Sequence, residues 1–242
     1  MYIALMQFKL NNQDIPLRFV QKPRARRISI TIKPFHGILV GVPPGLSVNE
    51  AQRFVEMKRK WIQKALDKTS EQERKFTIFT ENTYFVTRNH ELCIERTDGE
   101  RIRGKIENRK IRIFVPHGID IKNDVVQLSI RKGIEMAWAK EANEMLPARI
   151  MALAKEHGLF FNKLTIKNVK SKWGSCTGRN DIVLSIHLVR LPDILIDYVL
   201  LHELVHTIHK NHGPAFWSML HKLTGDSHGL DDQLNHFSIR MY

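Results

Sequence analysis

The sequence predicts an α+β protein whose strand-rich first part precedes a helix-rich second part. Short alternating or β-branched runs fill the first 115 residues, whereas apolar residues at helical spacing dominate from residue 124 onward. A chain of 242 residues can form one large or two small domains. We therefore predict a basic, β-rich domain over residues 1–115 and a helical/β domain over residues 116–242.

The first domain is expected to be mostly antiparallel, with one helix packed on its strands. Ser47 and Glu50 form a capping box, and the apolar stripe that follows as far as Leu66 has helical spacing. Within that stripe, Phe54 and Trp61 are expected to cover a small sheet. The predicted strands are residues 2–10, 16–20, 27–33, 38–42, 76–80, 83–87, 92–96 and 111–115.

The second domain begins with a long apolar helix over residues 124–157, which Pro147 is expected to kink or break because proline lacks the N–H that a helix needs. Two strand-like runs follow, 163–169 and 182–189. A further helix is predicted over residues 193–210, which have a start signal and a high apolar content.

The composition is that of an ordinary globular protein, with 43% hydrophobic and 26% charged residues. The apolar start at Met1–Met6 ends at Lys9 and lacks the features of a signal peptide, so we expect a strand there. No apolar run is long enough to span a membrane. Cys93 and Cys176 are far apart and form no Cys-x-x-Cys motif, which indicates a reducing compartment, and we expect the cytoplasm.

The net charge of +13 is concentrated in the first half of the chain. Residues 1–110 contain 22 Lys and Arg against 12 Asp and Glu, a net of +10, while residues 111–242 contain 16 against 13, a net of +3. Basic clusters at 22–27 and 58–60 suit nucleic acid or another polyanion as a partner. A solvated basic face without a ligand remains an alternative, because no zinc finger, phosphate loop or base-stacking motif accompanies the clusters.

Residues 202–206 form the motif His-Glu-Leu-Val-His. On a helix, positions i and i+4 share one face, so His202 and His206 can direct two imidazole nitrogens at one metal ion. Glu203 is then placed to accept a proton from a metal-activated water. Catalytic zinc takes three protein ligands and keeps a fourth position for that water. The motif therefore predicts a Zn2+-dependent hydrolase that needs one more ligand.

The third ligand is expected just beyond the helix. His212 precedes Gly213, so the chain can turn there and bring the imidazole back over the helix end. His209 lies one turn farther along the same face and is less suited to a tetrahedral site. His221 and His228 stay open as alternatives.

Supporting roles are less defined by the sequence. Tyr198, one turn before His202, is one candidate for stabilising the oxyanion. The ligand histidines also need acceptors that fix their tautomers, and Asp226, Asp231 or Asp232 could supply one.

A polar, glycine-containing segment, Lys170-Ser-Lys-Trp-Gly-Ser-Cys176, precedes the second strand-like run. This segment, Leu-Val-Arg-Leu-Pro192, Asp197-Tyr-Val, the His-Glu-x-x-His helix and Asn211-His-Gly-x-x-Phe-Trp217 together resemble the YgjP-like metallopeptidase family, which is related to the SprT-like and WLM zincin proteases. The resemblance covers about residues 170–217, and more loosely Arg27–Ile30 and Lys58–Ile62.

The resemblance implies a zincin-like domain acting on a peptide or protein, with His202, His206 and His212 as metal ligands and Glu203 as the base. Gly213 departs from the family, in which serine often follows the third histidine. The Trp-Gly-Ser-Cys element is similar to a strand edge beside the active site, to which an extended peptide could pair. Its alternative role is structural, with Trp173 packed on the metal helix. A thiolate of Cys176 on the metal would close the position that catalysis needs.

Two other functions remain open at this level. A metal-dependent hydrolase of nucleotide phosphoanhydrides would use the basic first half to neutralise phosphate, although such enzymes usually have more carboxylate ligands. A nucleic-acid-associated binding module with a structural zinc is the other, and an intact Glu203 argues against it because a structural site needs no base.

Overall fold

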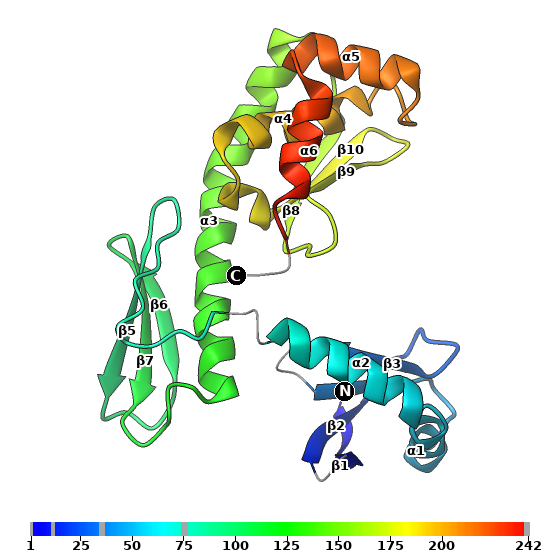
Figure 1. Cartoon of the computed structure of the whole chain (residues 1–242), viewed down its shortest axis with the longest axis vertical. Helices are drawn as coiled ribbons and strands as arrows, with labels where there is room; N and C mark the ends of the chain where they lie inside the picture. The colour runs from blue at the N-terminus through cyan, green and yellow to red at the C-terminus, as the bar shows by residue number, and fades with distance from the viewer. Residues whose placement is uncertain (1, 11–12, 34–36, 74–76, 240–242) are drawn as a thin grey trace. The chain divides into compact units, whose positions relative to one another are not determined.

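The computed structural model describes residues 2–10, 13–33, 37–73 and 77–239, and the chain divides into two compact units. Unit 1 spans Met1–Thr77 and unit 2 spans Ile78–Tyr242 (Figure 1). The division therefore falls well before residue 115, where the sequence predicts it. The strands between residues 91 and 116 belong to unit 2 because their buried side chains, such as Ile111 and Ile113, share one core with the following long helix. The α+β class is confirmed.

Unit 1 is a four-stranded sheet with two helices. Its strands run in the order β1-β2-β4-β3, in which β2 and β4 are parallel and the other pairs antiparallel. Phe19, Ile38 and Val55 are among the fully buried residues of its own core. The elements are β1 (Tyr2–Leu10), β2 (Gln13–Gln21), β3 (Ser29–Lys33), β4 (Gly37–Val42), α1 (Val48–Met57) and α2 (Arg59–Glu73).

The predicted capping box starts α1. The Ser47 hydroxyl accepts a hydrogen bond from the Glu50 N–H, and the Glu50 carboxylate accepts one from the Ser47 N–H at 2.8 Å. The single expected helix is two, because the chain turns at Lys58 between α1 and α2. The expectation that Trp61 covers the sheet is wrong, since its side chain is 52% exposed and Ile62 is buried instead.

Unit 2 opens with a three-stranded sheet on one side of a long helix. The strands β5 (Glu91–Thr97), β6 (Arg103–Glu107) and β7 (Lys110–Pro116) have the order β5-β7-β6, with β5 and β7 parallel. The sequence does not predict β6, whose exposed residues are mostly polar. Of the expected strand at 76–80, Phe76 lies outside the described residues and 77–80 form no strand, while 83–87 contribute a single bridge at Val86.

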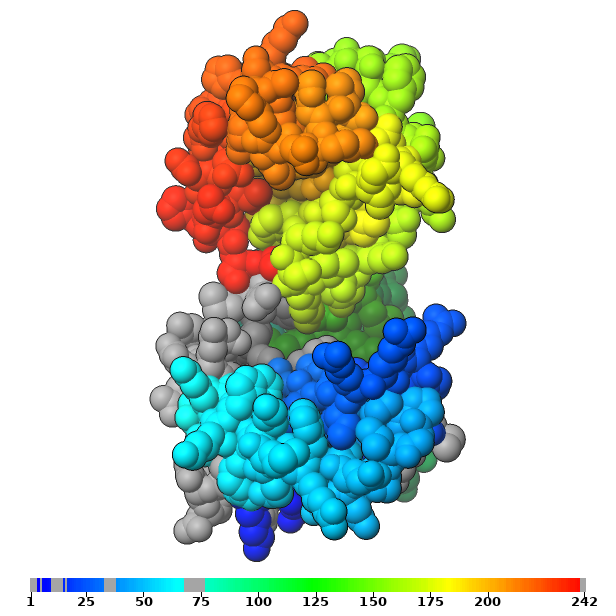
Figure 2. All heavy atoms as spheres, turned by 90° about the vertical axis from the view of Figure 1, so that its right-hand side faces the viewer, coloured from blue at the N-terminus to red at the C-terminus, as the bar shows by residue number. Residues whose placement is uncertain are grey.

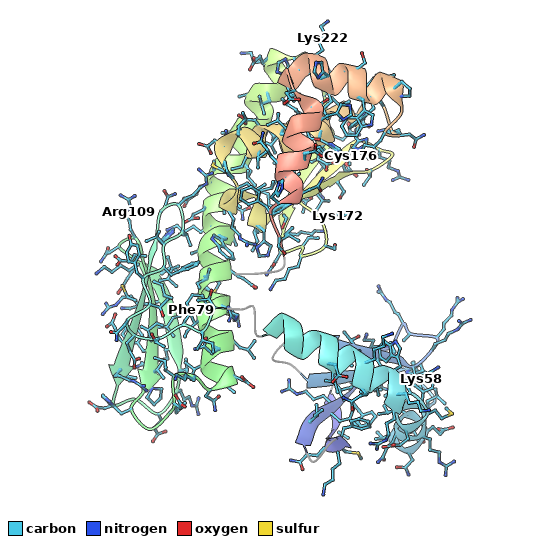
Figure 3. All side chains as sticks on the ribbon, in the orientation of Figure 1. Lys58, Phe79, Arg109, Lys172, Cys176 and Lys222 are labelled. Carbon is cyan, nitrogen blue, oxygen red and sulfur yellow. The ribbon has the colours of Figure 1, made fainter. Side chains whose placement is uncertain are left out.

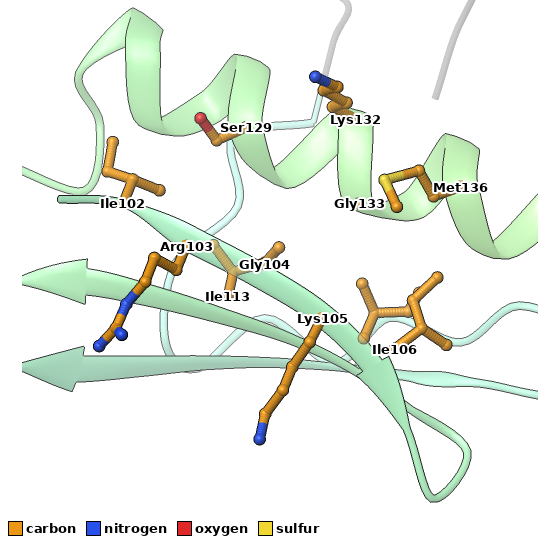
Figure 4. A pocket seen from close by; sticks show the side chains of 11 residues that line it. Ile102, Arg103, Gly104, Lys105, Ile106, Ile113, Ser129, Lys132, Gly133 and Met136 are labelled. Carbon is orange, nitrogen blue, oxygen red and sulfur yellow. The ribbon is translucent and has the colours of Figure 1, made fainter.

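A cavity of about 220 Å³ lies between this sheet and α3 (Asp124–Glu156). Ile106 and Ile113 approach the helix from the sheet, while Arg103 and Lys105 point away from it (Figure 4). No histidine, cysteine or carboxylate is among its lining residues, so it offers nothing to a metal.

The helix α3 is continuous through Pro147, so the expected break is absent (Figure 1). Proline removes one backbone hydrogen bond, but Leu146 and Ile150 on either side are fully buried. Burial of the helix on two sheets offsets the lost bond.

A second small sheet and three helices complete unit 2 on the other part of α3. The sheet order is β8-β10-β9, with β8 parallel and β9 antiparallel to β10, so β9 is an edge strand. Figure 2 shows α5 (orange), α6 (red) and the β9–β10 segment (yellow) on one face of unit 2. The elements are β8 (Lys163–Lys167), β9 (Gly174–Cys176), β10 (Asp181–Ser185), the 3-10 helix η1 (Ile186–Arg190), α4 (Asp193–Val205), α5 (Pro214–Thr224) and α6 (Ser227–Asn235).

Two predicted boundaries in this region change. The strand expected over 182–189 ends at Ser185, whose hydroxyl accepts the His187 N–H and so starts η1. The helix expected over 193–210 ends at Val205. Over the described residues, no helix is both long and apolar enough to cross a membrane, and Cys93 and Cys176 are free thiols.

Candidate metal centre

The helix α4, which carries the His-Glu-x-x-His motif, is fixed at its start by two arginines. Arg149 on α3 donates to the carboxylates of Asp193 and Asp197. Arg88 donates to the Val189 and Leu191 carbonyl oxygens and lies 2.9 Å from an Asp193 oxygen. These contacts set the position of α4 relative to α3 and η1, and thereby the position of the motif.

The three predicted ligands come together. The Nε2 atom of His212 lies 3.0 Å from that of His202 and 3.1 Å from that of His206. Among the described residues, no cysteine, aspartate or glutamate joins this cluster. In tetrahedral zinc coordination, two histidine nitrogens are separated by about 3.3 Å. Three neutral nitrogen donors at this spacing fit a divalent metal such as zinc and leave one coordination position without a protein ligand.

The end of α4 orients the second histidine. His206 is the C-cap of the helix, and beyond it the chain turns so that the His209 carbonyl oxygen lies 2.9 Å from Nδ1 of His206. A carbonyl only accepts, so Nδ1 carries the proton and Nε2 keeps its lone pair for a metal. The shortening of α4 relative to the prediction is therefore what supplies this carbonyl, and His209 acts through its backbone instead of its ring.

Phe216 forms the floor of the histidine cluster. Its ring centroid lies 4.9 Å from that of His202 and 4.6 Å from those of His206 and His212. Pro214 occupies the first turn of α5, a new helix that begins here. Fully buried Phe216 thus holds three imidazoles that belong to two different segments.

Burial keeps the first histidine neutral. Removal from water, with smaller effects of His206 and His212, lowers the pKa of His202 to about 3. Burial also lowers the pKa of His206. Neutral imidazoles are the form that binds a metal.

Glu203 is buried beside the cluster, with 5% of its surface exposed. One carboxylate oxygen, Oε2, has no hydrogen-bond partner among the described residues. Burial raises the pKa of Glu203 to about 7, although Lys172 and a hydrogen bond from the Cys176 backbone oppose the shift. A buried carboxylate with a free oxygen and a pKa near neutrality can accept a proton and return it.

The edge strand β9 covers this carboxylate. A Cβ atom at Gly174 would lie 2.6 Å from Oε1 and 2.7 Å from Cγ of Glu203, closer than such contacts allow. Glycine at this position is therefore required for Glu203 to occupy its place. The contact of Gly174 with Glu203 follows only from the packing of β9 on α4.

The sequence suggestions for supporting residues need correction. The Tyr198 hydroxyl donates to Asp231 at 2.9 Å and is buried, so Tyr198 is not directed at a substrate. Burial, together with Asp231, raises the pKa of Tyr198. Asp226 caps α6 by accepting the Gly229 N–H. The acceptor for His206 is a carbonyl, and none of the proposed aspartates contributes to it.

The two alternatives for the third ligand, His221 and His228, lie outside the cluster. His228 stacks on Trp217 with ring centroids 4.6 Å apart, and His221 is an exposed residue of α5. Cys176 is not within reach of the cluster. Burial raises the pKa of its thiol, which donates weakly to the Thr177 carbonyl oxygen.

The sequence matches the model of a known protein family over most of its length. Residues 26–237 match the family described as "YgjP-like, metallopeptidase domain". The chain belongs to this family. Membership supports a metallopeptidase-like hydrolase with a metal cofactor and a peptide or protein substrate. Since the matched range starts at residue 26, the match to the YgjP-like family includes most of unit 1 as well as the histidine cluster.

Among solved structures, the metallopeptidase zymogen of Methanocaldococcus jannaschii jannalysin is similar to part of this YgjP-like chain. The match has 21% identity and a TM-score of 0.33, and it covers 36% of this chain and 90% of the other. No curated protein gives a significant match.

Proposed function

We propose that this chain is a zinc-dependent peptidase in which His202, His206 and His212 hold the metal and Glu203 is the general base. The observation that carries the proposal is the convergence of three Nε2 atoms beside a buried carboxylate whose Oε2 has no partner among the described residues. A zinc ion held there supplies a Lewis acid for the scissile carbonyl and lowers the pKa of a water.

Glu203 performs the proton transfers. Gly174 and the Cys176 N–H hold one side of the carboxylate, which leaves Oε2 to take a proton from the attacking water. The same oxygen later delivers that proton to the leaving amine. Burial favours this exchange because the protonated and charged forms of Glu203 are then close in free energy near neutral pH.

The test compares Glu203→Gln with the unaltered protein for zinc content and for hydrolysis of a mixed peptide library. Glutamine keeps the size of the side chain and removes its basicity. We expect equal zinc and a loss of turnover of about 100-fold or more. Equal turnover by Glu203→Gln and the unaltered protein would contradict the role of Glu203 as general base. A parallel assay with nucleoside triphosphates separates peptide from phosphoanhydride hydrolysis, and hydrolysis of the nucleotides alone would overturn the peptidase.

We also propose that unit 1 binds nucleic acid through the loop between β2 and β3. Residues 1–77 contain 15 Lys and Arg against 6 Asp and Glu, a net of +9. Arg24, Arg26 and Arg27 in this loop are exposed, and none forms an ion pair with a described residue. Phosphate contacts by such side chains release counterions, so binding should weaken as salt is raised.

Binding of labelled DNA and RNA is measured against salt for the chain with Arg24, Arg26 and Arg27 changed to alanine. We expect the slope of log affinity against log salt to fall by about 2 to 3. Lys122→Ala, Lys140→Ala and Lys155→Ala together, at exposed positions in α3 and just before it, are the control for an equal loss of net charge. An equal effect of the three control substitutions would contradict a dedicated site on the loop.

A further inference from the structure

The segment between β8 and β9 is anchored to the rest of unit 2 by several hydrogen bonds. Asn168 donates to Glu135 on α3 at 2.7 Å and accepts from Nε2 of His187 at 3.0 Å. The Ser185 hydroxyl donates to the Val169 carbonyl, and the Ser185 N–H donates to the Trp173 carbonyl. The backbone is therefore fixed on both sides of Lys172.

The two lysines of this segment are in different environments. Lys170 pairs with the Glu135 carboxylate, which neutralises its charge. Lys172 is exposed, and no described residue forms a hydrogen bond or ion pair with its ammonium group. Figure 3 shows Lys172 on the loop that leads into the strand carrying Cys176. A free ammonium is thus presented by an anchored loop.

This ammonium lies close enough to the proposed base Glu203 to act on it electrostatically. Lys172 is two residues before Gly174, which packs directly against the Glu203 side chain, and it is the cation that acts electrostatically on Glu203. Glu203 does not depend on it for position, since Gly174 and the Cys176 N–H already hold the carboxylate. The ammonium group of Lys172 is therefore able to pair with a negatively charged group of a bound molecule.

A second lysine adds to the positive charge of this region. Lys210 donates to the Thr177 carbonyl and to the Asn180 side-chain oxygen, both of which are neutral. It acts electrostatically on His206 and Cys176. Together with a divalent metal, Lys172 and Lys210 favour a substrate that brings negative charge.

We propose that Lys172 is a specificity-determining residue that pairs with a carboxylate of the peptide substrate close to the scissile bond, so that acidic peptides are preferred. This inference rests on the proposed peptidase function. The carboxylate can belong to an aspartate or glutamate side chain or to the C-terminus of a short peptide. Both offer the same charged acceptor to an ammonium donor.

The experiment measures kcat/KM for matched peptides with glutamate, glutamine or lysine at each position flanking the scissile bond, each as free acid and as C-terminal amide. We expect the unaltered protein to prefer the glutamate peptide over the glutamine peptide by about fivefold. Lys172→Met should abolish this ratio, mainly through KM, and Lys172→Glu should shift the preference to the lysine peptide. A gain seen only with the free acids assigns the contact to a C-terminus.

Lys167→Met at the end of β8 is the matched control, because Lys167 is an exposed lysine just before the same loop. It should retain the selectivity of the unaltered protein. An unchanged ratio in Lys172→Met, or an equal change in Lys167→Met, overturns the assignment to Lys172.

Binding separates this inference from the peptidase proposal. Fluorescence anisotropy of labelled glutamate and glutamine peptides is measured with Glu203→Gln and with the same chain carrying Lys172→Met. If no peptide is cleaved but the glutamate peptide binds more tightly in a Lys172-dependent manner, the peptidase proposal fails and the specificity assignment stands. Equal binding of the two peptides to both variants overturns the assignment.

Discussion

Gly174 and Glu203 are in direct van der Waals contact, with no room between them for a methyl group. A Cβ atom at Gly174 would stand 2.6 Å from Oε1, 2.7 Å from Cγ and 2.9 Å from Cδ of Glu203. The nearby backbone N–H of Cys176 donates to the same carboxylate. The edge strand β9 therefore defines the position of the proposed base, although the two residues are far apart in the sequence.

Gly174→Ala should displace Glu203 and leave the three histidines in place. We expect kcat to fall by about 100-fold or more, because a positioned general base typically contributes a factor of this size to the rate. Zinc content, measured on the purified protein, should not change. Gly178→Ala in the turn after β9 is the control, since no atom lies within 4 Å of a Cβ there. A Gly174→Ala protein with full turnover would show that Glu203 has no fixed role.

His212→Ala should weaken zinc binding strongly. Loss of a residue that only orients a ligand lowers metal affinity by about 10- to 100-fold, and loss of a ligand itself should lower it by more. The reason is geometric, because the Nε2 atom of His212 lies within 3.1 Å of both helix histidines and completes the set of three. Affinity is measured by competition with a chelator. His221→Ala on α5 and His209→Ala are controls, and a loss of zinc in His209→Ala equal to that in His212→Ala would contradict the choice of third ligand.

The closeness of His202, His206 and His212 in the structure follows from local features of the sequence. His202 and His206 share a helix face because helical periodicity is a local property, and the placement of His212 after a turn depends only on neighbouring residues. The exact end of α4 is not predictable in this way. Whether the helix stops at Val205 or continues depends on the bond between His206 and the His209 carbonyl, which is a detail of the folded chain.

Contacts between residues that are far apart in the chain cannot be predicted from the sequence pattern. Nothing in the spacing of Gly174 indicates that it packs on Glu203, and nothing near Tyr198 indicates that its hydroxyl donates a hydrogen bond to Asp231. Pro214 suits both the end of one helix and the first turn of the next, and the structure uses the second role. The unit boundary is missed for a related reason, since only the β-rich sequence from residue 91 to residue 116 shares its core with α3.

Tyr198→Phe should reduce stability more than catalysis. The Tyr198 hydroxyl donates to Asp231, so its removal leaves a carboxylate without its donor and should lower the free energy of unfolding by about 1–3 kcal/mol, as measured by urea denaturation. A hydroxyl that stabilised an oxyanion would instead cost kcat about 100- to 1,000-fold. A drop of that size in kcat with unchanged stability would restore Tyr198 to the catalytic site.

His187 should make the protein less stable as the solution becomes acidic. Its side chain is fully buried, and burial, helped by the charges of Arg190 and Lys170 and opposed by Glu135, lowers its pKa to about 4. The unfolded chain binds a proton at this histidine below about pH 6.5, whereas the folded chain does so only near pH 4. The stabilising contribution is therefore complete above about pH 6.5 and is lost as the pH falls toward 4, by about 3 kcal/mol in total.

The measurement is the free energy of unfolding between pH 4 and pH 7.5 for the unaltered chain and for His187→Gln. Glutamine can still donate to Asn168 and does not titrate, so its curve should be flatter over this interval. His221→Gln, at an exposed position, should keep the slope of the unaltered chain. Protonation adds a proton at Nδ1 of His187, which lies 3.5 Å from the Arg190 guanidinium, so acid should weaken that contact and leave the bond from Nε2 to Asn168 in place. Parallel stability curves for His187→Gln and the unaltered chain would rule out His187 as the source of the acid sensitivity.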